Sequence, residues 1–304
     1  MKKIILIIIL ILVLPYILSS IFEKEKLIEL VHKDKTIRVL RSKTNKIEEI
    51  PFEEYVVGVL AGEMPLYFEE EALKAQAVAS RSYALKRIEY NKNKTYDVVD
   101  NTNNQVYLDN NYLKEVWKTN YTSYINKIRK IVNETSREYL DYNGSVVDAF
   151  FFSTSTGKTE NAKEIFNISL PYLVSVSSTW DEEVSPVFYD NYTFTLLDFY
   201  QKLNLPYNIN LNIEVIDTTS AGRIKSIKIN NETFTGSKIS STFNLRSTSF
   251  KIEKQGENVQ ITTTGFGHGV GMSQYGAEGM AKKGYTYDEI LKHYYQGVKI
   301  KKYN

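Results

Sequence analysis

An almost uninterrupted apolar run near the N-terminus limits the arrangements open to this chain more than any other feature. The run spans Ile4 to Phe22 and follows two lysines, Lys2 and Lys3. As a helix it would be about 28 Å long, close to the thickness of a bilayer core. Lysines before the run favour a cytoplasmic N-terminus, so the rest of the chain is predicted to lie outside the membrane.

A cleaved signal peptide is the alternative, because Ser19 and Ser20 are small residues near the end of the run. The run is longer than the usual apolar region of a signal peptide, about 7 to 15 residues, and no A-x-A-like site follows. We therefore predict four parts: a cytoplasmic N-terminus over 1–3, a signal anchor over 4–22, a juxtamembrane stalk over 23–35 and one large domain over 36–304.

Composition restricts the chemistry of this domain. The chain has no cysteine, which excludes disulfides and thiolate nucleophiles or ligands, so stability must come from a hydrophobic core. The formal net charge is only +2, so we expect no nucleic-acid partner.

Hydrophobic periodicity predicts helices in the first half of the chain and antiparallel strands later, which is typical of an α+β fold. The domain could divide into two lobes around a cleft. Helices are predicted over 52–60, 69–90, 111–134, 272–283 and 287–295. Strands are predicted over 36–40, 47–50, 213–217, 224–229, 250–254 and 259–263, with a hairpin over 139–152 that turns at Asn143-Gly144. The residues of the helix over 111–134 that are expected to face the core are Leu113, Trp117, Tyr121, Tyr124 and Ile128.

Glu63 is the candidate for acid–base chemistry. It lies between apolar residues 56–61 and the sequence Met64-Pro65-Leu66. A carboxyl group in apolar surroundings has a raised pKa, which suits a general acid near neutral pH. Its structural alternative is a glutamate at a helix end that pairs with a cation such as Lys74 or Arg81.

Lys74 and Arg81 are seven positions apart and would lie on one face of the helix over 69–90. Two cations on one face could bind a polyanion or a polar glycan. A solvated helix face explains the same spacing.

Two polar loops could contribute further contacts. The first, Ser153 to Glu160, carries hydroxyl groups, including those of Ser153 and Thr154, that could bind sugars; an ordinary polar turn is the alternative. The second places glycines at 265, 267, 269 and 271 around His268 and leads to Ser273 and Gln274. Alternate glycines allow a backbone to approach a ligand closely, but they also fit a tight strand-to-helix connection.

Five segments together carry a family resemblance. They are EYVVGVLAGEMP, EALKAQAVASRSYAL, FFSTSTGKTE, PYLVSVSSTWDEE and GFGHGVGMSQYGAEGMA. In these segments and in their order, the sequence resembles the stage II sporulation protein D family, within a wider group that also holds amidase-enhancer proteins. The resemblance covers nearly all of the chain after the stalk.

The resemblance implies a lytic transglycosylase that cleaves peptidoglycan strands already stripped of stem peptides, and so remodels septal wall during engulfment. It implies a catalytic role for Glu63, with Lys74 and Arg81 at positions associated with activity and Tyr172 and His268 in the groove. The product would carry a 1,6-anhydro-N-acetylmuramic end. A hydrolase would need a second carboxylate. The candidates for it are Asp148, Glu160, Asp181 and Glu183.

The resemblance also implies partners: stage II sporulation protein P, an amidase, and the membrane protein stage II sporulation protein M. It places the domain outside the cytoplasm, on the mother-cell side of the septum. Some relatives carry cysteine and histidine near the Ser153 loop, consistent with zinc, whereas this chain has Phe152, Ser153 and Ser155. We therefore expect no metal and no cofactor. The alternative function is a non-catalytic glycan-binding module that stimulates a cell-wall amidase.

Overall fold

The computed structural model describes residues 26–32 and 35–303. The predicted anchor over 4–22 lies outside these ranges. Within them, no helix has both the length and the apolar character needed to cross a membrane. The described part of the predicted stalk lies along α5 (Tyr121–Glu134), where Asn126 accepts a hydrogen bond from the backbone of Ile28 at 2.8 Å and donates one to that of Lys26 at 3.0 Å.

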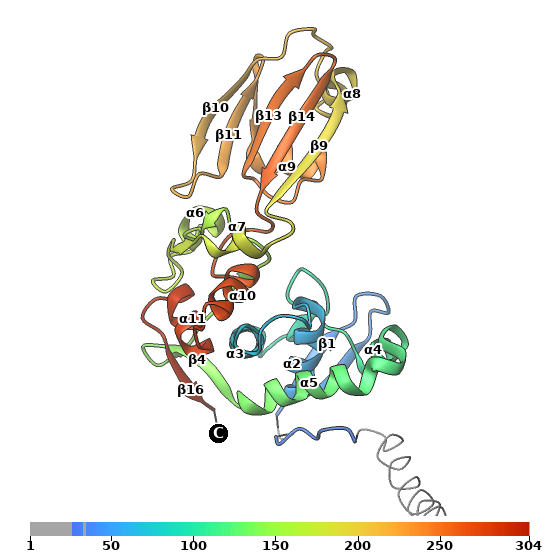
Figure 1. Cartoon of the computed structure of the whole chain (residues 1–304), viewed down its shortest axis with the longest axis vertical. Helices are drawn as coiled ribbons and strands as arrows, with labels where there is room; N and C mark the ends of the chain where they lie inside the picture. The colour runs from blue at the N-terminus through green and yellow to red at the C-terminus, as the bar shows by residue number, and fades with distance from the viewer. Residues whose placement is uncertain (1–25, 33–34, 304) are drawn as a thin grey trace, which may run out of the picture.

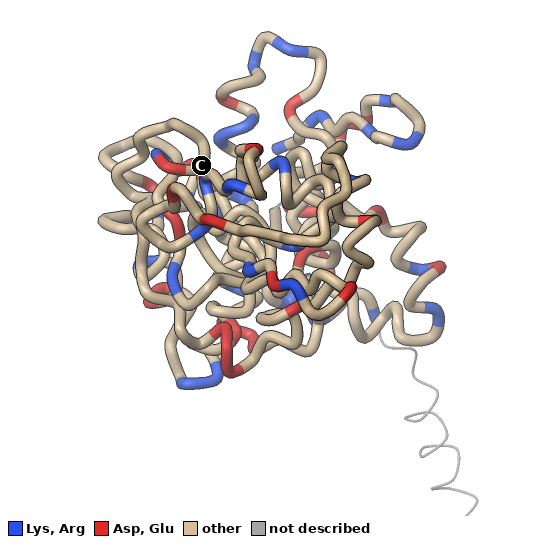
Figure 2. Tube along the Cα trace, turned by 90° about the horizontal axis from the view of Figure 1, so that it is seen from above, with Lys and Arg blue, Asp and Glu red and all other residues tan. Residues whose placement is uncertain are grey.

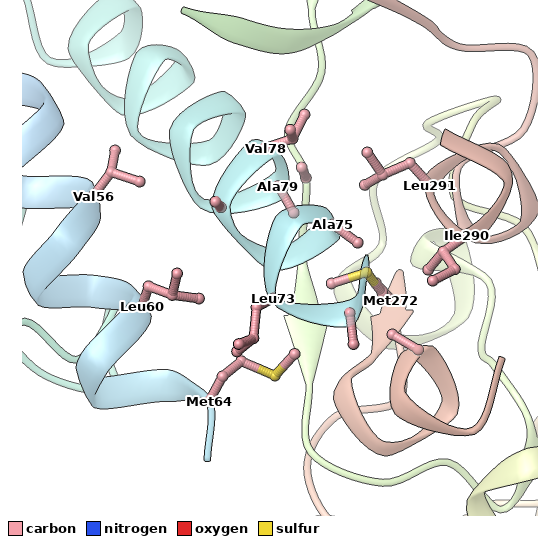
Figure 3. Close-up of a cluster of buried hydrophobic side chains, with 14 of the residues drawn as sticks. Val56, Leu60, Met64, Leu73, Ala75, Val78, Ala79, Met272, Ile290 and Leu291 are labelled. Carbon is pink, nitrogen blue, oxygen red and sulfur yellow. The ribbon is translucent and has the colours of Figure 1, made fainter. Parts of the chain in front are cut away.

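The main lobe consists of the described residues up to 187 together with 265–303, and it is built around α3 (Glu70–Tyr90) (Figure 1). Small residues along this helix let its neighbours approach closely, and Ala72, Ala75 and Ala79 are fully buried. α2 (Phe52–Glu63) packs on one side of α3, and α10 (Gln274–Lys282) and α11 (Tyr287–Tyr294) pack on another. Figure 3 shows apolar side chains of these helices meeting around α3.

Two small sheets flank the helices. β1 (Thr36–Leu40), β2 (Ile47–Pro51) and β3 (Val98–Val99) form a sheet in the order β2-β1-β3, and its apolar face shares a core with α2. β4 (Glu138–Tyr142), β5 (Ser145–Val146) and β16 (Lys299–Lys302) form the second, in the order β16-β4-β5. The predicted turn between β4 and β5 is confirmed: Asn143 and Gly144 both have positive φ, 52° and 86°.

The helix predicted over 111–134 is interrupted. α4 (Asn110–Trp117) is capped by Lys118, which has a φ of 47°, and a short 3₁₀ turn (Lys118–Asn120) leads into α5. Leu113 and Tyr121 are buried as expected. The inward orientation predicted for Tyr124 is wrong, because its side chain is 38% exposed, and Trp117 is only half-buried.

Short elements near the middle of the molecule bring distant segments of the chain together. β6 (Phe151–Phe152) pairs in parallel with β15 (Met272–Ser273), and β7 (Gly157–Lys158) pairs antiparallel with β8 (Ser177–Ser178). α6 (Ala162–Phe166) and α7 (Trp180–Val184) complete this region.

The β lobe, residues 188–264, has a hydrophobic core of its own (Figure 1). One sheet has the order β10-β11-β12 and the other β13-β14-β9, with two helices between strands. The elements are β9 (Tyr189–Thr195), α8 (Leu196–Lys202), β10 (Ile213–Thr218), β11 (Ile224–Ile229), β12 (Glu232–Thr235), α9 (Gly236–Phe243), β13 (Phe250–Gln255) and β14 (Asn258–Thr264). The α+β character predicted from the sequence is therefore confirmed.

Charged residues of both signs are interspersed along the trace (Figure 2). This distribution agrees with the small net charge of +2.

Candidate active site

Glu63 is the last residue of α2. The helix ends there because Pro65 disfavours a helical conformation at Met64, which is extended with φ −122° and ψ 136°. The Glu63 carboxylate accepts a hydrogen bond from the backbone N–H of Val106 at 2.6 Å. The side-chain amide of Gln274 donates to the Glu63 carbonyl oxygen at 3.1 Å. Glu63 is thus held between the segment before α4 and the first residue of α10.

Burial raises the pKa of Glu63 above its ordinary value of 4.5. The hydrogen bond from Val106 and the nearby amide of Gln274 oppose this shift, but desolvation outweighs both. A glutamic acid of this kind keeps its proton closer to neutral pH than an exposed one. The site therefore provides a group that can donate a proton and then take one back.

We expect Glu63→Gln to raise the Tm at pH 7. The pKa of Glu63 is higher in the folded protein than in the unfolded chain, so the ionised carboxylate destabilises the fold at any pH above the folded pKa. This loss of stability disappears as the pH falls below the pKa that Glu63 has in the unfolded chain. Glutamine is neutral throughout and can still accept from Val106. Thermal melts of both proteins at pH 7 and pH 4 test this. A variant less stable than wild type at pH 7 would contradict the burial argument.

Two glycines of α2 allow the segment after β3 to lie close to Glu63. A Cβ atom at Gly58 would lie 2.4 Å from the Tyr107 ring, and one at Gly62 would lie 2.6 Å from the Val106 carbonyl oxygen. This close approach places the Val106 N–H within reach of the carboxylate.

The glycine loop packs against the chain itself. Gly265, Gly267, Gly269 and Gly271 all have positive φ, between 74° and 100°. A Cβ atom at Gly271 would lie 1.9 Å from the Phe150 carbonyl oxygen, and one at Gly265 would lie 2.8 Å from that of Thr154. Gly269 instead lies against Glu160 and Arg223. The alternate glycines therefore serve close packing on the protein itself, as in the strand-to-helix connection considered as an alternative.

The two polar loops meet at Asp181. This buried carboxylate accepts hydrogen bonds from the hydroxyl groups of Ser155, Ser178 and Ser273, and from the backbone N–H of Ser155. Ser273 also caps α10 by accepting from the Gly276 N–H. Burial raises the pKa of Asp181, and the four donors oppose that shift. Asp181 thus ties the start of α10, which carries Gln274, to the Ser153 loop.

Several predicted sugar-binding groups are engaged inside the protein. Thr154 and Ser273 are fully buried, and the Thr154 hydroxyl lies 2.8 Å from that of Ser185. Ser153 is half-buried, and its carbonyl oxygen accepts from the Tyr275 N–H at 3.0 Å. Tyr172 is buried, and its hydroxyl oxygen accepts from the Asp148 N–H at 3.1 Å. These internal contacts hold the segments that carry the four residues in position.

His268 lies among the rings of Phe150, Phe152 and Phe166. Burial lowers its pKa to about 4, with the Arg223 guanidinium adding to the effect, so the imidazole is neutral near pH 7. It lines a cavity of about 210 Å³ together with residues 102–104. Val106, the donor to Glu63, follows two residues after Asn104 in the chain. The Nδ1 atom of His268 accepts a hydrogen bond from the Val270 N–H at 3.1 Å, and a neutral imidazole is not suited to act as the general acid.

Lys74 and Arg81 have different environments. Arg81 is completely buried and donates to both carboxylate oxygens of Glu53, at 3.0 and 2.8 Å. Lys74 is partly buried and pairs with Glu71 and Glu134, both at 2.9 Å. The shared cationic face predicted from their spacing does not form, because Arg81 does not reach the surface.

Sequence reasoning missed Arg223, which joins the two lobes. This residue precedes β11 in the β lobe and is 2% exposed. It donates to the Gly267 carbonyl oxygen at 2.7 Å and lies 3.5 Å from Glu160, a pair that spans the lobes. Burial lowers its pKa to about 10. Nothing in the local sequence distinguishes it from a solvated arginine.

The four candidate second carboxylates all have other partners. Asp148 pairs with Arg87, and Glu160 accepts from Thr219 at 2.9 Å. Glu183 pairs with Lys283 at 2.8 Å, and Asp181 binds the serines described above. Within residues 26–32 and 35–303, no group of three or more His, Asp or Glu side chains could hold a metal ion.

Comparison of the sequence with known proteins places this chain in one class of proteins. The sequence model of the stage II sporulation proteins matches residues 40–142, the segment that contains α2, α3 and Glu63. The chain is 41% identical over 270 residues to stage II sporulation protein D of Bacillus subtilis (strain 168), covering 87% of this chain and 78% of that protein. It is 40% identical, with the same coverage, to stage II sporulation protein D of Bacillus amyloliquefaciens. The chain therefore belongs to the stage II sporulation protein D family.

A more distant relative has a different name. The chain is 30% identical over 307 residues to the amidase enhancer of Bacillus subtilis (strain 168), covering 81% of this chain and 40% of that protein. The protein is thus a sporulation protein of this family and is related to the amidase enhancer.

Proposed function

We propose that this protein is a peptidoglycan lytic transglycosylase that acts on glycan strands without stem peptides, with Glu63 as its acid and base. The observation that carries the proposal is the raised pKa of Glu63 at a site bounded by Val106 and Gln274. Membership of the stage II sporulation protein D family supports the setting, remodelling of the septal wall during engulfment.

In the proposed reaction one carboxyl group acts twice. Protonated Glu63 gives its proton to the glycosidic oxygen as the bond from that oxygen to C1 of N-acetylmuramic acid breaks. The resulting carboxylate takes the proton of the C6 hydroxyl as O6 bonds to C1 and closes the 1,6-anhydro ring. Protonated Glu63 is regenerated, and no water is consumed.

The partners of the other carboxylates favour this route over hydrolysis. A hydrolase positions two carboxyl groups about 5 to 9.5 Å apart around the scissile bond. Asp148, Glu160, Asp181 and Glu183 each bind a cation or hydroxyl groups of the protein. A mechanism with Glu63 alone needs none of them.

The proposal extends to location and partners. An anchor over 4–22 would hold the domain outside the cytoplasm, at the mother-cell side of the septum. There it would follow an amidase that strips stem peptides, the role expected of stage II sporulation protein P, with stage II sporulation protein M as a membrane partner. Relationship to the amidase enhancer supports a link with amidases.

Mass spectrometry of the products tests the proposed reaction. Stripped glycan strands are incubated with the detergent-solubilised chain, and their ends are identified. Anhydromuramic ends are the expected result. Reducing ends would identify a hydrolase, and intact strands would contradict cleavage of either kind.

The amidase-enhancer relative favours a second candidate function, a glycan-binding module that stimulates an amidase without cleaving glycan. In that case the protein would accelerate stem-peptide release by a purified amidase while leaving strand length unchanged. Measuring both quantities in one digestion separates the two functions.

A further inference from the structure

A groove of about 610 Å³ lies beyond the C-terminal end of α2, between the residues that follow Glu63 and the helices α4 and α5. Its walls include three aromatic side chains, Tyr67, Trp117 and Tyr124. Tyr67 is 71% exposed and Tyr124 38% exposed, and the rings of Trp117 and Tyr124 meet edge to face at 5.6 Å. Exposed aromatic surface around a hollow is typical of a binding site.

Lys127 of α5 brings a positive charge to this groove. Its ammonium group donates to the carbonyl oxygens of Leu66 at 2.6 Å and Phe68 at 3.4 Å. An ammonium group has three donors, so one remains for a ligand. Within the described part of the chain Lys127 forms no ion pair, since the nearby Glu70 pairs with Lys130 at 2.9 Å.

The groove begins next to Glu63 in the chain, because Met64 and Pro65 are among its lining residues. Gln274 donates to the Glu63 carbonyl oxygen, and the hydroxyl of the next residue, Tyr275, lies 3.5 Å from that of Tyr67. A ligand that extends past Glu63 and this tyrosine pair would enter the aromatic groove.

We propose that this groove is a subsite for a sugar of the glycan strand beyond the scissile bond, with Lys127 pairing with a lactyl carboxylate. This inference rests on the proposed glycan function. Aromatic rings suit the C–H faces of pyranose sugars, because both are apolar and flat. Each muramic residue without a stem peptide has a free lactyl carboxylate, which complements the ammonium group. An intact stem peptide would replace this charge with an amide.

Tryptophan fluorescence tests the subsite directly, because the chain has only two tryptophans. Trp180 lies elsewhere, against Tyr285 and His293. The solubilised full chain with Trp180→Phe and Glu63→Gln carries Trp117 as its only tryptophan and is designed not to cleave. Stripped glycan strands should change the Trp117 emission saturably. The matched protein with Trp117→Phe, which retains Trp180, should show no change.

The charge is tested with oligomers of N-acetylglucosamine, which have no lactyl carboxylate. They should bind about tenfold more weakly than stripped strands of equal length, as expected for loss of one charge-assisted contact of about 1.4 kcal/mol. Lys127→Met should remove this difference. Retained binding of the neutral oligomer would show that the groove of the variant is intact.

Other outcomes separate the fate of the subsite from that of the proposed reaction. Strand cleavage by wild type without a Trp117 response to strands would reject the subsite and keep the proposed reaction. A saturable Trp117 response without cleavage by wild type would keep the subsite and reject the reaction. If anionic vesicles shift the Trp117 emission and glycan strands then cause no further change, the groove binds lipid rather than glycan.

Discussion

Replacing Glu63 with glutamine is expected to reduce the formation of anhydromuramic ends by about 1,000-fold or more. General acid–base catalysis contributes about 10² to 10⁴-fold, and here one group performs both steps. Glutamine can still accept the hydrogen bond from Val106, so the local structure should persist while proton transfer stops. Product ends are counted by mass spectrometry over a time course with stripped strands.

Glu183→Gln is the matched control for this experiment. Glu183 is an exposed carboxylate paired with Lys283, and it was one of the candidates for a second catalytic carboxylate. Its replacement should leave the rate within about twofold of wild type. The fold should also be preserved, because an exposed ion pair contributes only about 0 to 1 kcal/mol to folding stability. A Glu63→Gln protein as active as this control would remove Glu63 from the mechanism.

Replacing Arg81 with methionine is expected to destabilise the protein by about 3 to 5 kcal/mol. The change leaves the Glu53 carboxylate buried without its bidentate partner. The desolvation cost of this charge is then no longer offset by an ion pair. It also removes the donor to the Glu138 carbonyl oxygen, at 3.0 Å, that ties α3 to β4. Urea unfolding followed by circular dichroism measures the loss.

Lys74→Met provides the comparison on the same helix. Lys74 is only partly buried, so its two ion pairs should contribute no more than about 1 kcal/mol. If Lys74 binds glycan, its variant should lose activity with little change in the urea midpoint. Equal loss of stability in the two variants would argue against the distinction between a buried and a surface cation.

Regular elements were predictable where a periodic pattern extended over several residues. The helix expected over 69–90 is α3, and the turn at Asn143-Gly144 lies where predicted. The helix over 111–134 was not predicted as two pieces, because no proline or glycine marks the break at Lys118. Strands of two residues such as β6 and β15 exist only through their pairing and have no local signal.

The candidate site was predictable in part. Apolar neighbours and Pro65 correctly indicated a carboxyl group with a raised pKa at Glu63. Helical spacing alone suggested that Arg81 lies on the surface of its helix. Such a pattern cannot show that Glu53 of another helix pairs with the guanidinium group inside the core. Likewise, the alternate glycines did not show which residues they pack against: three of them contact residues 150–155, and Gly269 contacts Glu160 and Arg223.

The β lobe begins and ends at one place, where the Gly265 N–H donates to the Phe188 carbonyl oxygen at 2.7 Å. A segment whose two ends meet in this way has the geometry of an inserted domain, because the residues before it and after it are already neighbours in space. Its core is separate from the one that supports Glu63, so changes in its length need not move the carboxylate. Evolution could therefore exchange or resize this module to suit different partners while the chemistry at the end of α2 remains as it is.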